Sequence, residues 1–156
     1  MTSTHWAPME WQLSLCTDQF DSALLAFLSR CTLGVLATSA AHGSPQSALV
    51  GIAVTPELEI VFDTVASSRK YRNLSASAAC SLVIGCTGEQ TVQYEGVAEE
   101  LKPPELKRYQ EIYFKTFPDG PERLQWPGIV YFVVRPQWIR FIDYAQSPPL
   151  IKEFRY

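Results

Sequence analysis

Three basic side chains fall within four residues, directly after a pair of serines: Ser67, Ser68, Arg69, Lys70 and Arg72. A serine is a favourable N-cap, so Arg69 and Lys70 are predicted to lie in the first turn of a helix. Each cation is unfavourable there by about 0.3–1 kcal/mol, because a helix N-terminus carries a partial positive charge. An anion at the helix start removes the conflict, since free N–H groups, hydroxyls and both cations would converge on a phosphate. The alternative is a solvated basic surface, and composition alone does not separate the two.

The helices that must position this segment are indicated by apolar spacing and by start and stop signals. Helices are expected over 18–30, over 67–77 and from Pro103 to Pro118. The apolar residues Leu106, Tyr109 and Tyr113 mark the inner face of the last of these helices.

Strands dominate the rest of the chain, with turn residues between them. They are expected over 33–38, 46–54, 58–63, 80–84, 91–101, 129–135 and 138–143. Apolar and polar residues alternate over 58–63, which predicts a half-buried strand, whereas the apolar run over 80–84 predicts burial on both faces. Gly96 marks a bulge. Six or seven antiparallel strands with few helices favour a closed or partly closed barrel, so the fold class is mainly β with flanking helices.

Length and composition bound the possible functions. The 156 residues are expected to form a single domain, 1–156, with 1–16 as a loose N-terminal arm. The apolar share of 47% can build a core without disulfides. A net charge of −3 gives no support for nucleic-acid binding, so any anion site must be local.

The cysteine spacing and the N-terminal sequence argue against a metal-binding, a secreted and a membrane-spanning protein. None of Cys16, Cys31, Cys80 and Cys86 forms a Cys-x-x-Cys pair, and only two histidines accompany them, so no metal site is expected. We interpret the cysteines as reduced and mostly buried. The N-terminus lacks a secretory signal and no apolar run is long enough to span a membrane. A soluble, cytoplasmic protein is therefore expected.

The order of several short motifs resembles the FMN-binding split-barrel proteins related to pyridoxamine 5'-phosphate oxidase. Asp63-Thr64, a short loop and Ser68-Arg69-Lys70-x-x-Asn73-Leu74 look like the phosphate-binding segment of that family. Leu36-Ala37-Thr38 with Gly43-Ser44-Pro45 resembles its first hairpin, and 94–99 resembles its Gly-x-Ala-Glu strand. The resemblance covers roughly 20–101, with weaker support to 143.

The resemblance implies a Greek-key-like split β-barrel that binds FMN as a homodimer. Arg69 and Lys70 would hold the FMN phosphate, and Ser68 and Thr64, following Asp63, would add hydroxyl or backbone donors. The flavin ring or ribityl chain would lie along Ala48, Leu49 and Val50. The second subunit would contribute residues near Gln90 or Thr91, together with Trp138 or Arg140, although surface exposure or core packing explains these four equally well.

Two departures separate this chain from the oxidase itself. The cationic positions of the oxidase's second strand fall on Ala48 and Ala53 here. The oxidase's C-terminal Arg-Leu-His-Asp-type segment is also absent. Residues 135–140 resemble it only weakly, and no histidine follows them. These departures favour an FMN-binding relative with an unidentified small substrate.

The expected function is that of an FMN-dependent oxidoreductase, in which the flavin carries the hydride. No catalytic residue can be assigned from the sequence. One alternative is a non-enzymatic flavin-binding or redox-sensing module. Another is a relative that uses deazaflavin F420 or haem, although His5 and His42 lie in an arm and a turn, which disfavours haem.

Overall fold

The computed structural model describes residues 18–85 and 88–156. The predicted N-terminal arm, His5, Cys16 and Cys86 therefore lie outside the described residues. Within these ranges the helices are α1 (Asp18–Arg30), α2 (Arg69–Ala76), α3 (Leu106–Thr116) and α4 (Gly120–Arg123). The strands are β1 (Leu33–Ser39), β2 (Pro45–Gly51), β3 (Ala53–Val54), β4 (Ile60–Val65), β5 (Ala79–Ile84), β6 (Gln90–Glu100), β7 (Ile129–Asp143) and β8 (Leu150–Arg155).

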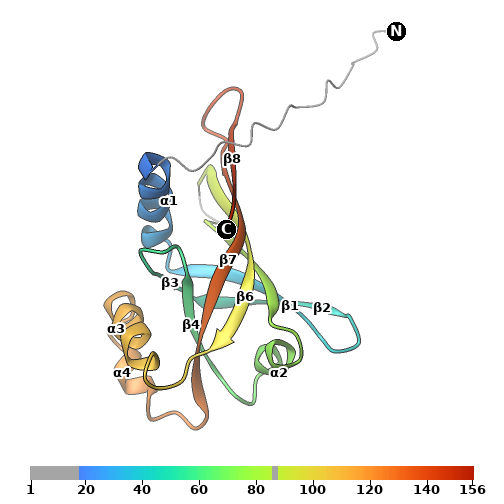
Figure 1. Cartoon of the computed structure of the whole chain (residues 1–156), viewed down its shortest axis with the longest axis vertical. Coiled ribbons are helices and arrows are strands. Elements are labelled where there is room, and N and C mark those ends of the chain that lie inside the picture. Colours follow the sequence, from blue (N-terminus) through green and yellow to red (C-terminus); the bar gives the residue numbers. More distant parts are fainter. Residues whose placement is uncertain (1–17, 86–87) are drawn as a thin grey trace.

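The described strands form one antiparallel sheet of eight strands, in the order β2-β1-β5-β6-β7-β4-β3, with β8 added to β7. β2 and β3 are opposite ends of this path, yet only Ile52 separates them along the chain. The sheet must therefore curl until its two ends meet, which is the split-barrel fold expected above (Figure 1). The single strand predicted over 46–54 is divided at Ile52, because β2 pairs with β1 while β3 pairs with β4.

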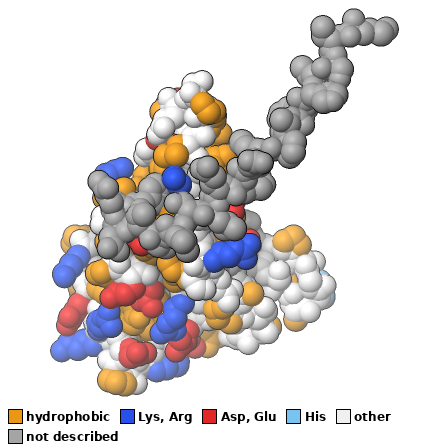
Figure 2. Space-filling view, turned by 45° about the horizontal axis from the view of Figure 1, so that its top comes forward, with side chains coloured by type: hydrophobic (Ala, Val, Ile, Leu, Met, Phe, Trp, Pro, Cys, Tyr) orange, Lys and Arg blue, Asp and Glu red, His pale blue; other side chains and the backbone are white. Residues whose placement is uncertain are grey.

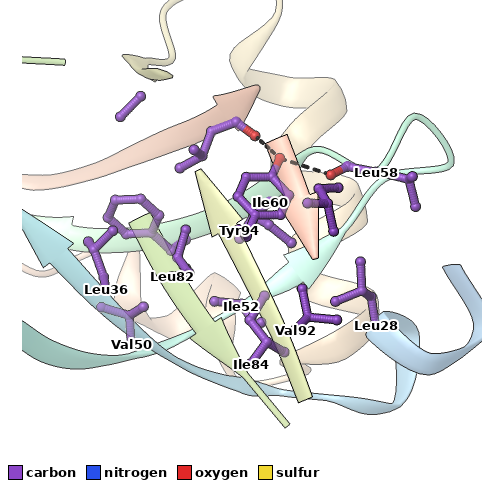
Figure 3. Close-up of a cluster of buried hydrophobic side chains, with 14 of the residues drawn as sticks. Leu28, Leu36, Val50, Ile52, Leu58, Ile60, Leu82, Ile84, Val92 and Tyr94 are labelled. Carbon is purple, nitrogen blue, oxygen red and sulfur yellow. Dashed lines mark hydrogen bonds between the residues drawn. The ribbon is translucent and has the colours of Figure 1, made fainter. Parts of the chain in front are cut away.

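The barrel interior is apolar and contains one polar anchor, the hydroxyl of Tyr94 (Figure 3). This fully buried hydroxyl is shared between the carbonyl oxygens of Leu58, at 3.0 Å, and Val134, at 2.9 Å. Leu58 has a φ of 62° and lies in a turn closed by its N–H and the carbonyl of Thr55. The prediction that a strand begins at Leu58 is therefore wrong, and β4 begins at Ile60.

A second apolar cluster lies outside the barrel, where α3 packs on β4 and β7. Tyr109 and Tyr113 of α3 contact a buried layer that includes Val61 and Val133. Because the barrel core covers the other face of β4, this strand is almost wholly buried and the prediction of a half-buried strand is wrong. The predicted inner face of α3 is confirmed for both tyrosines.

Within 18–85 and 88–156, no helix packs on the outer face of β1, β2 and β5. Leu33 is 52% exposed, Leu49 63% and Val83 43%. The prediction that 80–84 is buried on both faces is wrong for the face that carries Val83. Neighbouring exposed apolar residues on one sheet face form a candidate contact surface.

The longest strands, β6 and β7, bend together at Gly96. The register shifts between Glu95 and Gly96, as the predicted bulge requires, and a Cβ on Gly96 would meet the carbonyl oxygen of Arg135 at 2.3 Å. β7 is continuous where two strands were predicted. Pro136 is tolerated because it lies beside the bulge, after the pairing with β4 ends and before the pairing with β8 begins at Trp138.

The helices surround the barrel at separate places. α1 lies beside the end of the sheet that carries β8, α2 lies below the β1–β2 hairpin, and α3 and α4 lie together against β4 (Figure 1). The surface around α3 and α4 mixes acidic and basic side chains (lower left of Figure 2). No helix within 18–85 and 88–156 is long and apolar enough to span a membrane. α4 and β8 were not predicted.

Candidate cofactor site

The loop between β4 and α2 is closed by two hydroxyl groups. Ser68 is the N-cap of α2, with extended backbone angles, and its Oγ accepts a hydrogen bond from the N–H of Tyr71 at 3.1 Å. The Oγ1 of Thr64, at the end of β4, lies 3.1 Å from the same Ser68 Oγ. The predicted cap is therefore confirmed at Ser68, and it ties the helix start to β4.

The first turn of α2 carries basic residues and no acidic residue. Arg69 is exposed and Lys70 is half-buried. Neither cation belongs to any of the salt bridges of the described residues. The helix N-terminus and two unpaired cations thus act in the same direction, and the local electrostatics favour an anion.

A cavity of about 270 Å³ opens at this helix start. We call it the α2 cavity. Ala48 of β2 lies on one side of it, while Arg69 and Lys70 lie on the other. Its lining residues are Thr38, Gln46, Ser47, Ala48, Arg69 and Lys70. The structure therefore brings together the two predicted cations and one residue of the predicted ring-binding strand.

A buried asparagine fixes α2 against the β1–β2 hairpin. The side-chain amide of Asn73 donates to Thr38 Oγ1 and to Gln46 Oε1, both at 2.9 Å. Sequence reasoning did not assign a role to Asn73, Thr38, Gln46 or Ser47. The available signal was the place of Asn73 in the helix motif and of the polar pair Gln46-Ser47 just before Ala48.

Replacing Asn73 with alanine should lower the free energy of unfolding by about 1–3 kcal/mol, because the buried Thr38 hydroxyl and the partly buried Gln46 side chain both lose their donor. Urea unfolding measures this directly. Ser75→Ala is the matched control on the same helix, since Ser75 is exposed and bonds only to the Tyr71 carbonyl. Equal effects of the two substitutions would show that Asn73 does not anchor the helix.

Leu49, Val50 and Asp63 face away from the α2 cavity. Leu49 lies on the open outer face of the sheet, and Val50 is part of the barrel core. Asp63 points toward α3 and α4, where its carboxylate accepts hydrogen bonds from Tyr113 at 3.0 Å and from Arg123 at 2.8 Å. Burial, followed by the nearby Asp63 charge, raises the pKa of the Tyr113 hydroxyl. Asp63 thus holds the outer helices in place.

The four predicted second-subunit residues also lie away from the α2 cavity of their own chain. Gln90 donates to Asp143 at 2.9 Å, and Thr91 donates to the carbonyl of Ile84 at 3.2 Å. Arg140 lies 3.5 Å from a carboxylate oxygen of Glu153. Trp138 and Arg140 are separated by Ile139 on β7, so their side chains lie on the same face of the sheet. Contact with the α2 cavity could therefore come only from another copy of the chain.

The described cysteines do not belong to this site. Cys31 and Cys80 are partly buried, and neither forms a disulfide in the described part of the chain. Burial raises the pKa of the Cys80 thiol to about 12, so it stays protonated and is a poor nucleophile. Within the described ranges, no group of three His, Cys, Asp or Glu residues could hold a metal ion.

If the chain carries FMN, as the family resemblance implies, Cys31→Ser and Cys80→Ser should change its rate of flavin reduction by less than about twofold, because neither thiol forms a disulfide within the described residues and the Cys80 thiol stays protonated. Stopped-flow absorbance of the FMN-loaded variants is the measurement. Loss of reduction in a variant that still melts like the wild type would contradict this expectation.

The fold is a split barrel with a cavity at the start of α2, where Arg69 and Lys70 lie. Over residues 20–143 the chain matches the sequence profile of pyridoxamine 5'-phosphate oxidase, and it belongs to that family. No curated protein matches the chain significantly in sequence.

Solved structures share the fold. The heme binding protein from Mycobacterium smegmatis has a TM-score of 0.75 at 17% identity, over 90% of this chain and 60% of that one. The pyridoxamine 5'-phosphate oxidase-related, FMN binding protein from Nostoc punctiforme has a TM-score of 0.65 at 12% identity, over 92% and 98%. General Stress Protein 26 from Bacillus anthracis has a TM-score of 0.68 at 18% identity, over 88% and 99%. The chain thus spans less than two thirds of the mycobacterial protein and nearly all of the other two.

Proposed function

We propose that this protein binds FMN at the α2 cavity and acts as an oxidoreductase on a small substrate. The observation that carries the proposal is the pair of unpaired cations, Arg69 and Lys70, at the start of α2 beside a cavity. Such a site needs an anion, and a phosphate matches its donors. The resemblance to FMN-binding members of the family supports FMN among phosphate-bearing ligands.

Different residues would bind the FMN phosphate and hold the helix start in position. Arg69 offers a fork of N–H donors and Lys70 a point charge to the phosphate. The backbone N–H groups of the same two residues lie in the first turn, where a helix provides no acceptor for them. Ser68 and Thr64 keep the helix start in place. Bound FMN would supply hydride transfer, while the protein anchors and orients it.

We further propose that two copies form the functional unit through the outer face of the sheet. Cross-strand pairing places Leu49, Val35, Val83, Gln93 and Arg140 in one row across β2, β1, β5, β6 and β7. Side chains paired across strands share a face, so Arg140 lies on the same surface as the exposed Leu49 and Val83. We call this set the outer row.

A two-fold contact through the outer row would bring residues of one copy toward the flavin of the other. Leu49 and Ala48 lie on opposite faces of β2, and β2 is an end strand of the sheet, so partner residues would reach the α2 cavity around this strand. An isologous interface covers the same patch on both copies at once, so both flavins would be covered together. The predicted contributions of Trp138 and Arg140 would then come from the partner copy, as proposed from the family resemblance.

Anaerobic reduction tests the enzymatic part of the proposal. FMN-loaded protein is mixed with NADPH in a stopped-flow instrument, and flavin bleaching is compared with that of free FMN. Reduction faster than that of free FMN supports an oxidoreductase that uses a transient nicotinamide reductant. If neither NADPH nor NADH reduces the bound flavin faster than free FMN, this activity would be overturned and a flavin-binding module would be favoured.

A further inference from the structure

A second cavity, of about 370 Å³, lies between α1 and the end of the sheet where β6, β7 and β8 meet. We call it the α1 cavity. It shares no lining residue with the α2 cavity. Its lining residues are Ala23, Leu24, Ala26, Phe27, Arg30, Gln90, Phe141, Asp143 and Leu150. The volume is within the range of small-ligand sites.

One wall of the α1 cavity is a face of α1. Ala23, Ala26, Phe27 and Arg30 recur at helical spacing, and the two alanines leave room that a larger side chain would fill. Phe27 packs edge-to-face on Phe141 of β7, with ring centroids 5.6 Å apart. This wall therefore offers an apolar surface to a ligand.

The acidic group of the α1 cavity is the carboxylate of Asp143, a residue that is only 8% exposed. Its oxygens accept hydrogen bonds from Gln90 Nε2 and from the N–H of Ala145, both at 2.9 Å. These two bonds and one from the side chain of Gln146 lower the pKa of Asp143, so it is ionised at neutral pH.

All the recorded donors to Asp143 are uncharged. None of the salt bridges within the described ranges involves Asp143. The remaining segments, 1–17 and 86–87, contain neither Lys nor Arg. Arg30 is the cation among the lining residues, but it forms no salt bridge with Asp143, so an ammonium group placed on the carboxylate would make a charge-assisted contact that the described residues do not provide.

We propose that the α1 cavity binds a small apolar primary amine, with its ammonium group on Asp143 and its apolar body against Phe27 and Phe141. An ammonium group has three donors, and the carboxylate has lone pairs beyond those that the neutral donors use. Arg30 lies at the rim, with its guanidinium carbon 5.8 Å from the centroid of the Phe27 ring. This second positive charge disfavours diamines and polyamines, so the expected ligand carries one ammonium group.

The test compares 2-phenylethylamine with its uncharged counterpart 2-phenylethanol, by calorimetry on the full chain with and without added FMN. The amine should bind at least about tenfold more tightly than the alcohol, as a charge-assisted hydrogen bond requires. Asp143→Asn keeps the shape of the side chain and should reduce amine affinity to that of the alcohol. Because FMN is proposed to bind elsewhere, its presence should not change these values.

Two further variants keep the test decisive if Asp143→Asn fails to fold. Ala26→Leu fills the α1 cavity and should abolish amine binding, whereas Ser29→Leu adds the same bulk to an exposed position of α1 outside the lining and should not. Equal affinities for amine and alcohol would overturn the proposal, as would full amine binding by Ala26→Leu. Absence of amine binding to the wild type would overturn it as well, without bearing on FMN.

Discussion

Replacing Arg69 with alanine should weaken FMN binding by about tenfold to a hundredfold and leave riboflavin binding nearly unchanged. A charge-assisted hydrogen bond is worth about 1.5–3 kcal/mol. Riboflavin has no phosphate, so it makes no such bond with Arg69 and loses nothing in the variant. Arg69 is exposed and takes part in no salt bridge of the described residues, so its loss removes no internal ion pair. Titration of flavin fluorescence gives both affinities.

The control for Arg69→Ala is Arg108→Ala, which removes one positive charge from α3. Arg108 is exposed and its only recorded ion pair is a 3.7 Å contact with Glu57. FMN affinity should change by less than about threefold in this variant, because surface charges beyond a Debye length are screened. If Arg69→Ala weakened FMN and riboflavin equally, Arg69 would be a folding residue and the phosphate assignment would be wrong.

Replacing Leu49 with aspartate should convert the proposed dimer to monomers and weaken FMN binding with it. Leu49 is 63% exposed and lies in the outer row, so in a monomer the introduced carboxylate stays in solvent and should not destabilise the fold. In a two-fold interface it places two carboxylates in an apolar contact. A hot-spot residue contributes about 2 kcal/mol or more, and Leu49 would occur twice in a two-fold interface, so the dimer should weaken by more than about a hundredfold. Light scattering at micromolar concentration measures the mass.

Leu124→Asp is the matched control for this substitution. Leu124 is 44% exposed, but it follows α4 and lies outside the sheet. This variant should keep the mass and the FMN affinity of the wild type. A wild-type protein that is already a monomer while it binds FMN tightly would contradict the proposed interface.

Most elements of the fold could be predicted because their signals are local. The helix breakers around α3 and the alternation in β6 are readable within a few residues. Burial of β4 on both faces was not readable, because it depends on α3 folding back over Val61 from a distant part of the chain. The continuity of β7 through Pro136 depends on which partner strands lie beside that residue.

The candidate site shows the same division between local and distant information. Ser68, Arg69 and Lys70 are placed by one helix start, so their proximity could be predicted. Asp63 precedes Thr64 in the motif, yet its partner Arg123 is sixty positions away and sets its direction. Asn73 was part of the recognised motif, but its role became visible only when β1 and β2 supplied its acceptors.

The visible absorption spectrum of the purified protein, taken without added cofactor and again after dialysis against FMN, tests the central claim most directly. We predict the two absorption maxima of an oxidised flavin, retained through gel filtration and released on denaturation as FMN. A deazaflavin band or a Soret band that cannot be displaced by FMN would contradict the account, as would complete failure to retain FMN.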